Sequence, residues 1–312
     1  MSSFSNQVKN EITVIDETVN KKELLRGLLQ INATISFTSE GLTLKFKTKN
    51  INIVNLLADL IYEFYKTESI ILSSQEKRLN KETIYMLEVN QNASYIIRDL
   101  KIVEAKEDIS YSLKKEISSE DERASYLRGA FLACGSINDP KSLTYHMEIQ
   151  TFNMMVATNL RDLMNTFGLN AKLSKNRRGY IVYLKKAETI SDFIRIIGAS
   201  ESVMEFENLR IEKDLSNSIN RIMNCEIANK RKTEESARRQ IDEINYLMSH
   251  NIELKPGLKD VANLRLKYPD DSLTELSVKS EEELEKPISR NTVIHRLREI
   301  HEIFVNNSVS QE

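Results

Sequence analysis

A glycine-containing apolar segment occurs twice in this chain. Residues 126–137 read Tyr-Leu-Arg-Gly-Ala-Phe-Leu-Ala-Cys-Gly-Ser-Ile, and Leu25–Gly27 matches Leu127–Gly129 at a spacing of 102 positions. Both segments have the composition of a buried helix, in which an internal glycine costs about 1 kcal/mol relative to alanine. Two glycines at matched positions therefore suggest a requirement. The simplest is a seam at which two helices approach too closely for a side chain.

Composition limits the classes of protein to which the chain can belong. It has 312 residues, 40% hydrophobic and 29% charged, with only 4 prolines, which predicts two or three folded, helix-rich domains. The net charge of −2 does not by itself indicate a polyanion partner, so any basic surface must be local. The cysteines, Cys134 and Cys225, form no Cys-x-x-Cys pair, as expected of a reduced cytoplasmic protein. Residues 1–15 lack a signal-peptide pattern, and no apolar run approaches the ~18 residues of a membrane span.

Hydrophobic periodicity predicts the elements of the first half. Leu42, Leu44 and Phe46 alternate with polar residues, which indicates a strand that is apolar on one face and basic on the other. Two apolar stretches around 70–72 and 84–87 flank a polar tip and predict a hairpin. Helical spacing predicts helices over 5–15, 22–34, 51–66 and 92–103, and polar residues 104–122 read as a linker.

The second half repeats this order. We expect a helix over 123–136, a strand over 145–152, a helix over 154–167, a hairpin over 171–185 and a helix over 187–197. Each half therefore reads αβαββα, and a tandem repeat of this size predicts two copies related by an approximate two-fold axis. The expected fold is α+β, with a first region at 1–104, a second half at 120–200, a helical connector at 201–254 and an all-α domain at 255–312.

Basic residues occur at corresponding places in the two halves. The first strand carries Lys45 and Lys47, with Lys49 following, and the second hairpin carries Lys172, Lys175, Arg177 and Arg178 with no acid between Ala171 and Ala187. Such residues often form only a solvated surface. Their pseudo-symmetric placement makes phosphate contacts an equally good interpretation. The sequence alone leaves both open.

Residues 205–249 contain no glycine or proline and read as a long helical connector. Five asparagines (Asn208, Asn217, Asn220, Asn224 and Asn229) are unusual for a helix and hint at breaks or contacts. The basic residues at 230–232 and 238–239 are better explained as a solvated face than as a ligand site.

Three short helices are expected after residue 255. The first ends before Pro269, Ser272 and Glu275 form a capping box for the second, and Ser289 is a good N-cap for the third. In the third helix Val293, Leu297, Ile300 and Phe304 form an apolar stripe, while Asn291, His295, Arg298 and Glu302 point the other way. This pattern is typical of a helix-turn-helix, whose last helix presents its N-terminal residues to bases in the major groove. The alternative is a three-helix cap on the larger domain, which the 11 acids against 9 basic residues from Leu254 onward favour.

The sequence offers little for catalysis. The four histidines, His146, His250, His295 and His301, have no metal-ligand spacing, and there is no glycine-rich phosphate loop or nucleophile elbow. We therefore assign no catalytic residue, no metal site and no cofactor.

The Leu127–Gly135 segment resembles the LAGLIDADG helix of homing endonucleases, in which two such helices form a seam. In that family an acid beside the last glycine of each helix holds a divalent metal at the scissile phosphate. The matching positions here are Asn32 and Cys134, neither of which is a carboxylate, the oxygen ligand that a hard cation needs. The resemblance therefore supports the fold and argues against the nuclease.

The whole chain resembles the WhiA family of bacterial sporulation and cell-division transcription regulators. The residues that carry the resemblance run nearly end to end: Phe4-Ser5, Val8-Lys9, residues 126–133, Gly135-Ser136, residues 138–141, Glu207-Asn208, residues 224–229, Lys232-Thr233, residues 239–241, residues 273–276, Ile288-Ser289 and residues 295–298. The resemblance implies a non-cleaving LAGLIDADG domain joined to a helix-turn-helix similar to that of sigma factors. It also implies binding to double-stranded DNA, association with the nucleoid and a role in division, chromosome segregation or sporulation.

These interpretations predict a set of DNA-binding residues in the last domain. Arg290, Asn291 and His295 are candidates for base edges, and Arg296 and Arg298 for phosphates, with Ser272, Thr274, Ser289 and Thr292 beside them. Two rival functions remain, a metal-dependent homing endonuclease and a module that docks a sigma factor or RNA polymerase. Residues 277–287 are a few residues longer than the usual turn of the family, which predicts a longer loop before the last helix.

Overall fold

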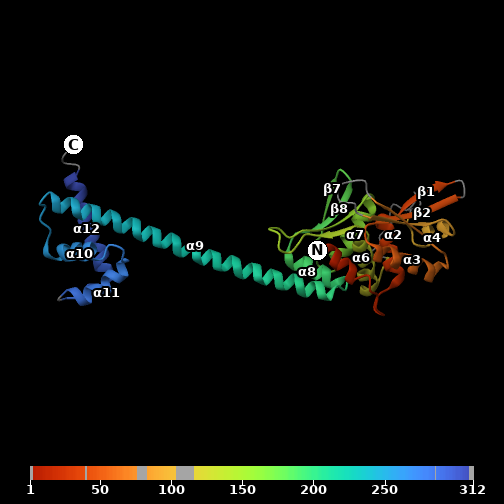
Figure 1. Ribbon diagram of the computed structural model, residues 1–312, viewed down its shortest axis with the longest axis horizontal. Coiled ribbons are helices and arrows are strands. Elements are labelled where there is room, and N and C mark those ends of the chain that lie inside the picture. Colours follow the sequence, from red (N-terminus) through yellow and green to blue (C-terminus); the bar gives the residue numbers. More distant parts are fainter. Residues whose placement is uncertain (1–2, 39–40, 76–82, 103–115, 285, 309–312) are drawn as a thin grey trace. The chain divides into compact units, whose positions relative to one another are not determined.

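The structure is a computed structural model that describes residues 3–38, 41–75, 83–102, 116–284 and 286–308. The chain divides into two compact units, residues 1–214 and 215–312. The first unit contains two similar halves built of helices and strands, and the described residues of the second form helices and the loops between them (Figure 1). No helix in the described part of the chain is both long and apolar enough to cross a membrane.

The first half is built on a four-stranded antiparallel sheet with strand order β1-β2-β4-β3. The register is fixed by apolar residues on one face, where Leu44 lies opposite Val89 and Phe46 opposite Leu87, all four buried. The elements are α1 (Phe4–Glu11), α2 (Lys21–Asn32), β1 (Thr34–Thr38), β2 (Gly41–Thr48), α3 (Ile51–Tyr65), β3 (Ile70–Gln75), β4 (Thr83–Val89) and α4 (Ala93–Asp99).

The second half has the same topology, with strand order β5-β6-β8-β7 and antiparallel pairing throughout. Its elements are α6 (Glu120–Cys134), β5 (Gly135–Ile137), β6 (Met147–Thr151), α7 (Met154–Thr166), β7 (Lys172–Asn176), β8 (Gly179–Leu184) and α8 (Ala187–Ile196). The tandem repeat expected from the sequence is therefore confirmed.

Each half contains one strand more than the predicted αβαββα order. β1 and β5 begin one or two residues after the glycine-containing helix, so the predicted helices over 22–34 and 123–136 ran into them. β1 alternates Ile35 and the exposed Phe37 with polar residues over only five positions, and β5 has only three residues, so both patterns are too short to stand out from the end of the preceding helix. Both are held by pairing with β2 and β6, which local periodicity does not reveal.

Three other predicted bounds differ from the structure. The opening helix ends at Glu11 rather than residue 15, and α4 is shorter than the predicted 92–103. The predicted linker 104–122 lies mostly outside the described residues, and its end belongs to α6. There Ser119 and Glu122 form a capping box, which makes a polar stretch the first turn of a helix.

The two glycine-containing helices, α2 and α6, pack against each other inside the first unit (Figure 1). A Cβ atom on Gly27 would overlap the carbonyl oxygen of Tyr126 and lie 3.0 Å from the amide nitrogen of Ala130. A Cβ on Gly129 would overlap the carbonyl oxygen of Leu24 and lie 2.9 Å from the amide nitrogen of Leu28. The two backbones therefore meet directly, and the seam predicted from the repeated glycine is present.

The arginine before each of these glycines is buried. Arg128 donates from Nε to the carbonyl oxygen of Ile12 at 2.9 Å and from Nη2 to that of Val14 at 2.6 Å, which ties the residues after α1 to the seam. Arg26 pairs with Glu116, 3.0 Å from Nη2 to Oε2. These contacts offset the free-energy cost of burying the two charged guanidinium groups.

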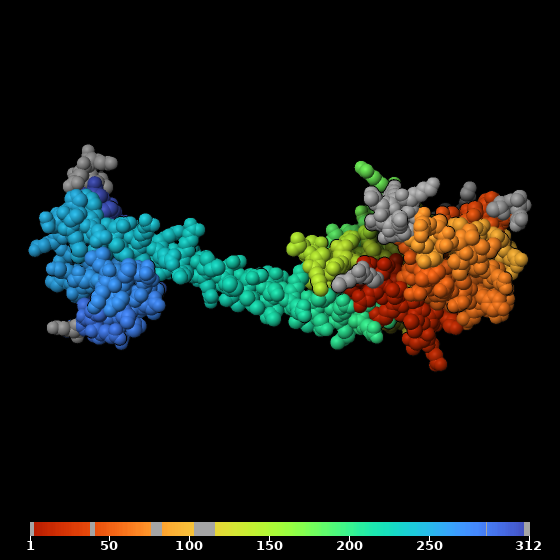
Figure 2. Space-filling view, viewed as in Figure 1, coloured from red at the N-terminus to blue at the C-terminus, as the bar shows by residue number. Residues whose placement is uncertain are grey.

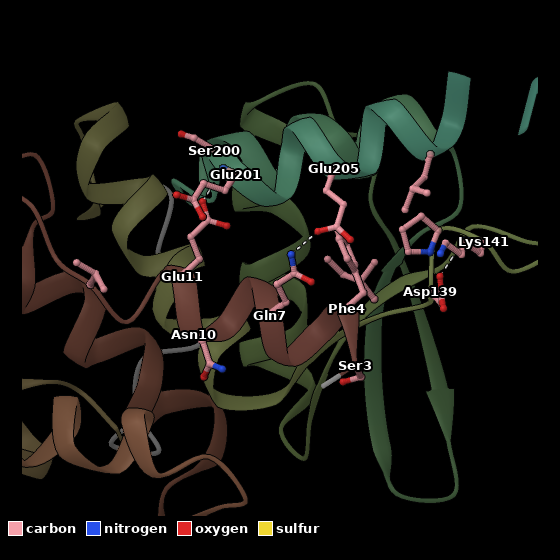
Figure 3. A pocket seen from close by; sticks show the side chains of 14 residues that line it. Ser3, Phe4, Gln7, Asn10, Glu11, Asp139, Lys141, Ser200, Glu201 and Glu205 are labelled. Atoms are coloured by element: carbon pink, nitrogen blue, oxygen red, sulfur yellow. Dashed lines mark hydrogen bonds between the residues drawn. The ribbon is translucent and has the colours of Figure 1, made fainter. Parts of the chain in front are cut away.

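Helix α1 links several parts of the first unit. Ser5 exchanges two hydrogen bonds of 2.7 Å with the backbone of Ile137 in β5. Glu11 accepts hydrogen bonds from the amides of Glu201 and Ser202 at 2.7 and 3.0 Å, so its carboxylate caps the start of α9 (Ser200–Ser249; Figure 3). A carboxylate there also compensates the positive end of the helix dipole.

Helix α9 runs without interruption for 50 residues, so the breaks suggested by its asparagines do not occur. Its first residues join the core of the first unit through Val203 and Phe206. Its last residues join the core of the second unit through Ile244 and Leu247. Between them four apolar residues of the helix are exposed, namely Ile211, Leu215, Ile219 and Ile222.

The second unit contains the three helices predicted after residue 255. They are α10 (Pro256–Lys267), α11 (Leu273–Glu283) and α12 (Arg290–Ser308), and Figure 2 shows them packed against the end of α9. The predicted capping box of Ser272 and Glu275 is present, and the Ser289 hydroxyl accepts from the amide of Thr292 at 3.2 Å. The prediction of a longer loop over residues 277–287 is partly wrong, because residues 277–283 belong to α11.

Candidate nucleic-acid interface

The foot of the seam has no carboxylate at either of the two matched positions. The Asn32 side chain donates from Nδ2 to the carbonyl oxygen of Lys47 at 2.9 Å, and Cys134 is half-buried at the end of α6. Lys9 lies close by, 5.8 Å from Nζ to the centre of the Phe131 ring. Burial lowers the pKa of Lys9 to about 8, partly opposed by Cys134, and burial raises the pKa of the Cys134 thiol. A lysine amine and a thiol are poor ligands for a hard cation, and the amide of Asn32 offers a neutral oxygen without the negative charge of a carboxylate.

The described residues contain no group of three or more His, Cys, Asp or Glu side chains that could hold a metal ion. A cavity with a volume of about 1050 Å³ lies beside α1 (Figure 3). Its lining includes Glu11, Asp139, Glu201 and Glu205 but only one basic residue, Lys141. A polyanion would be repelled there, so this cavity is not a site for nucleic acid.

The first sheet is less basic than the sequence suggested. Lys45 is half-buried and pairs with Glu88 at 3.3 Å, whereas Lys47 and Lys49 are exposed. The neighbouring strand β3 places Ile70 and Leu72 on the same face as Lys45, because Ile70 is opposite Glu88 and Glu88 is opposite Lys45. Both apolar side chains are about half exposed. This face is therefore mixed, with a smaller positive area than the predicted one.

The second hairpin keeps its positive character. Lys172, Lys175, Arg177 and Arg178 are all exposed, and Arg177 and Arg178 form the turn between β7 and β8. Lys175 lies 5.9 Å from the centre of the Tyr180 ring. The turn requires Gly179, whose φ is +123°, and a Cβ there would press against the backbone of Thr151. The structure thus presents Lys175, Arg177 and Arg178 toward the turn of the hairpin, with Lys172 at the other end of β7.

Helix α12 displays most of the predicted base-reading residues. Val293, Leu297 and Ile300 are buried against the other helices of the unit, which turns Asn291, His295 and Arg298 outward. Ser289 and Thr292 serve the start of the helix, where their hydroxyl oxygens lie 2.9 Å apart. Arg290 is exposed at the first position of the helix.

Arg296 does not share that face. A Cβ on Gly257 would lie 3.1 Å from Cζ of Arg296, so the guanidinium packs against the start of α10. Arg298 instead lines a shallow cavity with Arg239 of α9 and His301 of α12. The two arginines therefore lie on different sides of α12, and the structure does not bring them together as one phosphate-binding pair.

Ser272, Thr274 and Arg290 do come together. They line a cavity of about 260 Å³, whose other residues include Lys232 and Gln240 of α9 and Arg265 of α10. The sequence analysis assigned none of Lys232, Gln240 and Arg265 to a site. Lys232 was grouped with a solvated charged face, and its neighbours Lys230 and Arg231 do pair with Glu234 and Glu235.

A signal for Arg265 was present in the sequence. It lies four residues after Val261 and seven after Leu258, which places it on the apolar stripe of α10. A charge on such a stripe must be satisfied by buried partners or by a ligand. The sequence does not mark Gln240 as a site residue in this way, because glutamine is a common residue on a partly exposed helix.

Family models match nearly all of the chain. The WhiA N-terminal LAGLIDADG-like domain matches residues 18–103, the WhiA LAGLIDADG-like domain residues 123–216, and the WhiA C-terminal HTH domain residues 219–304. The last match includes the second half of α9 together with the three helices that follow it. The part of the chain that carries Lys232 and Gln240 thus belongs to the matched HTH domain.

Similar proteins cover the same length. The chain is 37% identical over 308 residues to the probable cell division protein WhiA of Latilactobacillus sakei, covering 97% of each chain. It is 39% identical over 306 residues to the protein of that name from Exiguobacterium sibiricum, covering 96% of this chain and 95% of the other.

Solved structures show the same fold. The crystal structure of full-length WhiA from Thermatoga maritima matches with a TM-score of 0.59 and 21% identity, covering 98% of this chain and 99% of that one. The N-terminal LAGLIDADG domain of WhiA matches with a TM-score of 0.50 and 20% identity over 64% of this chain and 91% of that one. Together with the identities of the full-length relatives, these matches show that the chain is a member of the WhiA family.

Proposed function

We propose that this chain is a non-catalytic, sequence-specific DNA-binding regulator of transcription that acts in bacterial cell division, chromosome segregation or sporulation. The names of its relatives support the link to cell division, and the matched HTH domain supports DNA as the partner. Binding to promoters would place the protein at the nucleoid in the cytoplasm.

One observation carries the proposal. Asn291 and His295 project outward from the N-terminal half of α12, whose opposite side is buried, and Arg290 stands exposed at its first position. A recognition helix reads bases with this part of its surface, where Asn suits adenine and Arg suits guanine by bidentate hydrogen bonding. Arg298 is one turn further along, where it can reach a phosphate. Arg296 has no place in this contact, because it packs against Gly257.

A second area of DNA contact is supported by the hairpin of β7 and β8. Lys172, Lys175, Arg177 and Arg178 are exposed, and none forms an ion pair with a residue that the structure describes. Unpaired cations of this kind add affinity that does not depend on base sequence. Lys47, which is exposed on β2, could add to it from the first sheet, whereas Lys45 is engaged by Glu88.

The chemistry at the seam argues against cleavage. Phosphodiester hydrolysis by the LAGLIDADG mechanism needs a carboxylate at the foot of each helix to hold the metal, and Asn32 and Cys134 occupy those positions. Lys9 adds a partly buried amine where a metal site would need negative charge. The rival role of docking a sigma factor or RNA polymerase is supported by exposed apolar residues, which include Ile70 and Leu72 on β3 and a row on α9 formed by Ile211, Leu215, Ile219 and Ile222.

Selection from a random duplex library tests the proposal. The full chain should enrich one sequence motif, and a variant with Arg290→Ala, Asn291→Ala and His295→Ala should enrich none. Arg231→Ala, which alters an exposed and ion-paired arginine of α9, is the control and should select the same motif. Failure of the unmodified chain to enrich any motif would refute sequence-specific binding. Cutting of the enriched duplex in the presence of Mg²⁺ would refute the absence of catalysis.

A further inference from the structure

The cavity between α9 and the starts of α11 and α12 has the composition of an anion site. Its lining contains three cations, Lys232, Arg265 and Arg290, and no carboxylate. Lys232, Ser236 and Gln240 lie four residues apart in succession on one face of α9, so they all point toward the same cavity. Hydroxyl and amide donors thus surround a space of about 260 Å³ that carries a positive charge.

Arg265 is the central feature of this cavity. Its side chain is only 1% exposed, and its Nη1 donates to the carbonyl oxygens of Asp271 at 2.6 Å and Tyr268 at 3.3 Å. Its Nε has no hydrogen-bond partner among the described residues, although the atom is buried. A buried, unpartnered donor on a charged group is costly unless an acceptor from outside the chain completes it.

The surroundings of Arg265 add to that cost. Burial lowers the pKa of its guanidinium, only partly opposed by Asp271. The Oε1 atom of Gln240 is likewise buried and without a partner among these residues. A half-turn of that amide exchanges the oxygen for its NH₂ group, which would supply a second donor.

The start of α11 contributes backbone donors. This helix has 11 residues, and its capping box uses the amides of Ser272 and Glu275. The amides of Leu273 and Thr274, in the first turn, have no carbonyl partner within the helix itself. Thr274 and Leu273 both line the cavity, where the positive end of the helix dipole favours an anion.

We propose that this cavity, hereafter the Arg265 pocket, binds a phosphate group, with Arg265 Nε and the start of α11 as fixed donors and Lys232 and Arg290 as the flanking cations. The phosphate can come from the backbone of target DNA or from a free phosphate-bearing ligand. The first source rests on the proposed function, because Arg290 then belongs both to the pocket and to the base-reading end of α12. It also makes α9 part of the DNA-binding surface rather than only a connector.

Two measurements on the full chain distinguish the sources. The first follows the Nε–Hε NMR resonance of Arg265, identified by its loss in Arg265→Lys, while inorganic phosphate replaces chloride at constant ionic strength. The resonance should shift with saturation, and Lys232→Ala should raise the half-saturating concentration several-fold. Lys232 is exposed on a helix, so its truncation leaves the fold intact. Lys230→Ala, two residues away and paired with Glu234, should leave the titration unchanged.

The second measurement is the salt dependence of affinity for the enriched duplex. If the phosphate is that of DNA, Lys232→Ala should lower affinity by about 5-fold and the slope of log K against log salt by about 1, while Lys230→Ala changes neither. A phosphate-dependent shift without any effect on duplex binding assigns the pocket to a free ligand. If neither phosphate nor duplex responds to Lys232→Ala, the Arg265 pocket is not a phosphate site. That result would not contradict sequence-specific DNA binding. Conversely, a failure of sequence-specific binding would not contradict a phosphate-dependent shift of the Arg265 resonance.

Discussion

Gly27 and Gly129 lie where α2 and α6 touch, each facing a backbone carbonyl of the other helix, that of Tyr126 beside Gly27 and that of Leu24 beside Gly129. The seam between the two halves is therefore a contact between backbones. Because the arrangement is reciprocal, a methyl group on either glycine would separate the same pair of helices.

Replacement of Gly129 or Gly27 by alanine should destabilise the first unit by about 3 kcal/mol or more, because overlap with a carbonyl cannot be relieved by a rotamer change. Helix propensity alone predicts the opposite, a gain of about 1 kcal/mol. Denaturant unfolding of the full chain measures the difference. Gly168→Ala is the control, since its Cβ would meet open space at a φ of +74° and should cost only about 1 kcal/mol. A stabilised Gly129→Ala protein would contradict the close approach.

Glu11→Ala should loosen the start of α9. The carboxylate accepts from the amides of Glu201 and Ser202 and from the Ser202 hydroxyl at 2.6 Å, so its loss should cost about 1–2 kcal/mol. Hydrogen exchange should accelerate at these two amides. Glu17→Ala, which removes an exposed carboxylate, serves as the control. Unchanged protection in Glu11→Ala would show that the cap does not order the helix.

Lys9 should make stability depend on alkaline pH. Its pKa is lowered from 10.5 to about 8 by burial, so between those values the unfolded chain binds more protons than the folded one. Stability should therefore rise with pH across this window and stay level below it. Lys9→Met should remove the rise and stabilise the protein at pH 7 by roughly 1–3 kcal/mol.

Lys141→Met, which changes an exposed lysine, is the matched control for the pH experiment. The quantity to plot is the difference in unfolding free energy between each variant and the unmodified chain, because this cancels most other titrating groups. A Lys9→Met difference that is flat from pH 7 to 10.5 would show that the amine is not desolvated.

The two cysteines should differ in reactivity. Cys225 is exposed on α9, whereas Cys134 is half-buried and burial raises the pKa of its thiol. The thiolate is the reactive form, so iodoacetamide at neutral pH should label Cys225 and spare Cys134 until the chain unfolds. Peptide mass mapping reads out both sites. Equal labelling in the native state would contradict the packing at the foot of the seam.

The sequence predicted those features whose cause is local. The capping box at Ser272 and the N-cap at Ser289 each leave a signature within a few residues, and each is present in the structure. The seam was predictable although its contact is not local, because the same glycine-containing segment is repeated 102 positions apart. β1 and β5 were not predicted, because they are held by pairing with partner strands elsewhere in the sheet.

The Arg265 pocket was not predicted from the sequence, for a similar reason. Its residues come from four helices, α9 to α12, and are brought together only by packing, so no stretch of sequence displays them side by side. The opposite error concerned Arg296, which shares α12 with Asn291 and His295 but packs against Gly257. Helical spacing gives the side of a helix on which a residue lies, and not what the neighbouring helices place there.

Sequence preference is the property that the account most depends on. The direct measurement is the ratio of affinities of the full chain for the enriched duplex and for a scrambled duplex of the same composition, at one salt concentration. Arg290→Ala with Asn291→Ala should bring this ratio close to 1, by a loss of about 1–3 kcal/mol for each base contact, while affinity for the scrambled duplex changes far less. A ratio that stays as high as that of the unmodified chain would contradict the assignment of α12 as the reading helix.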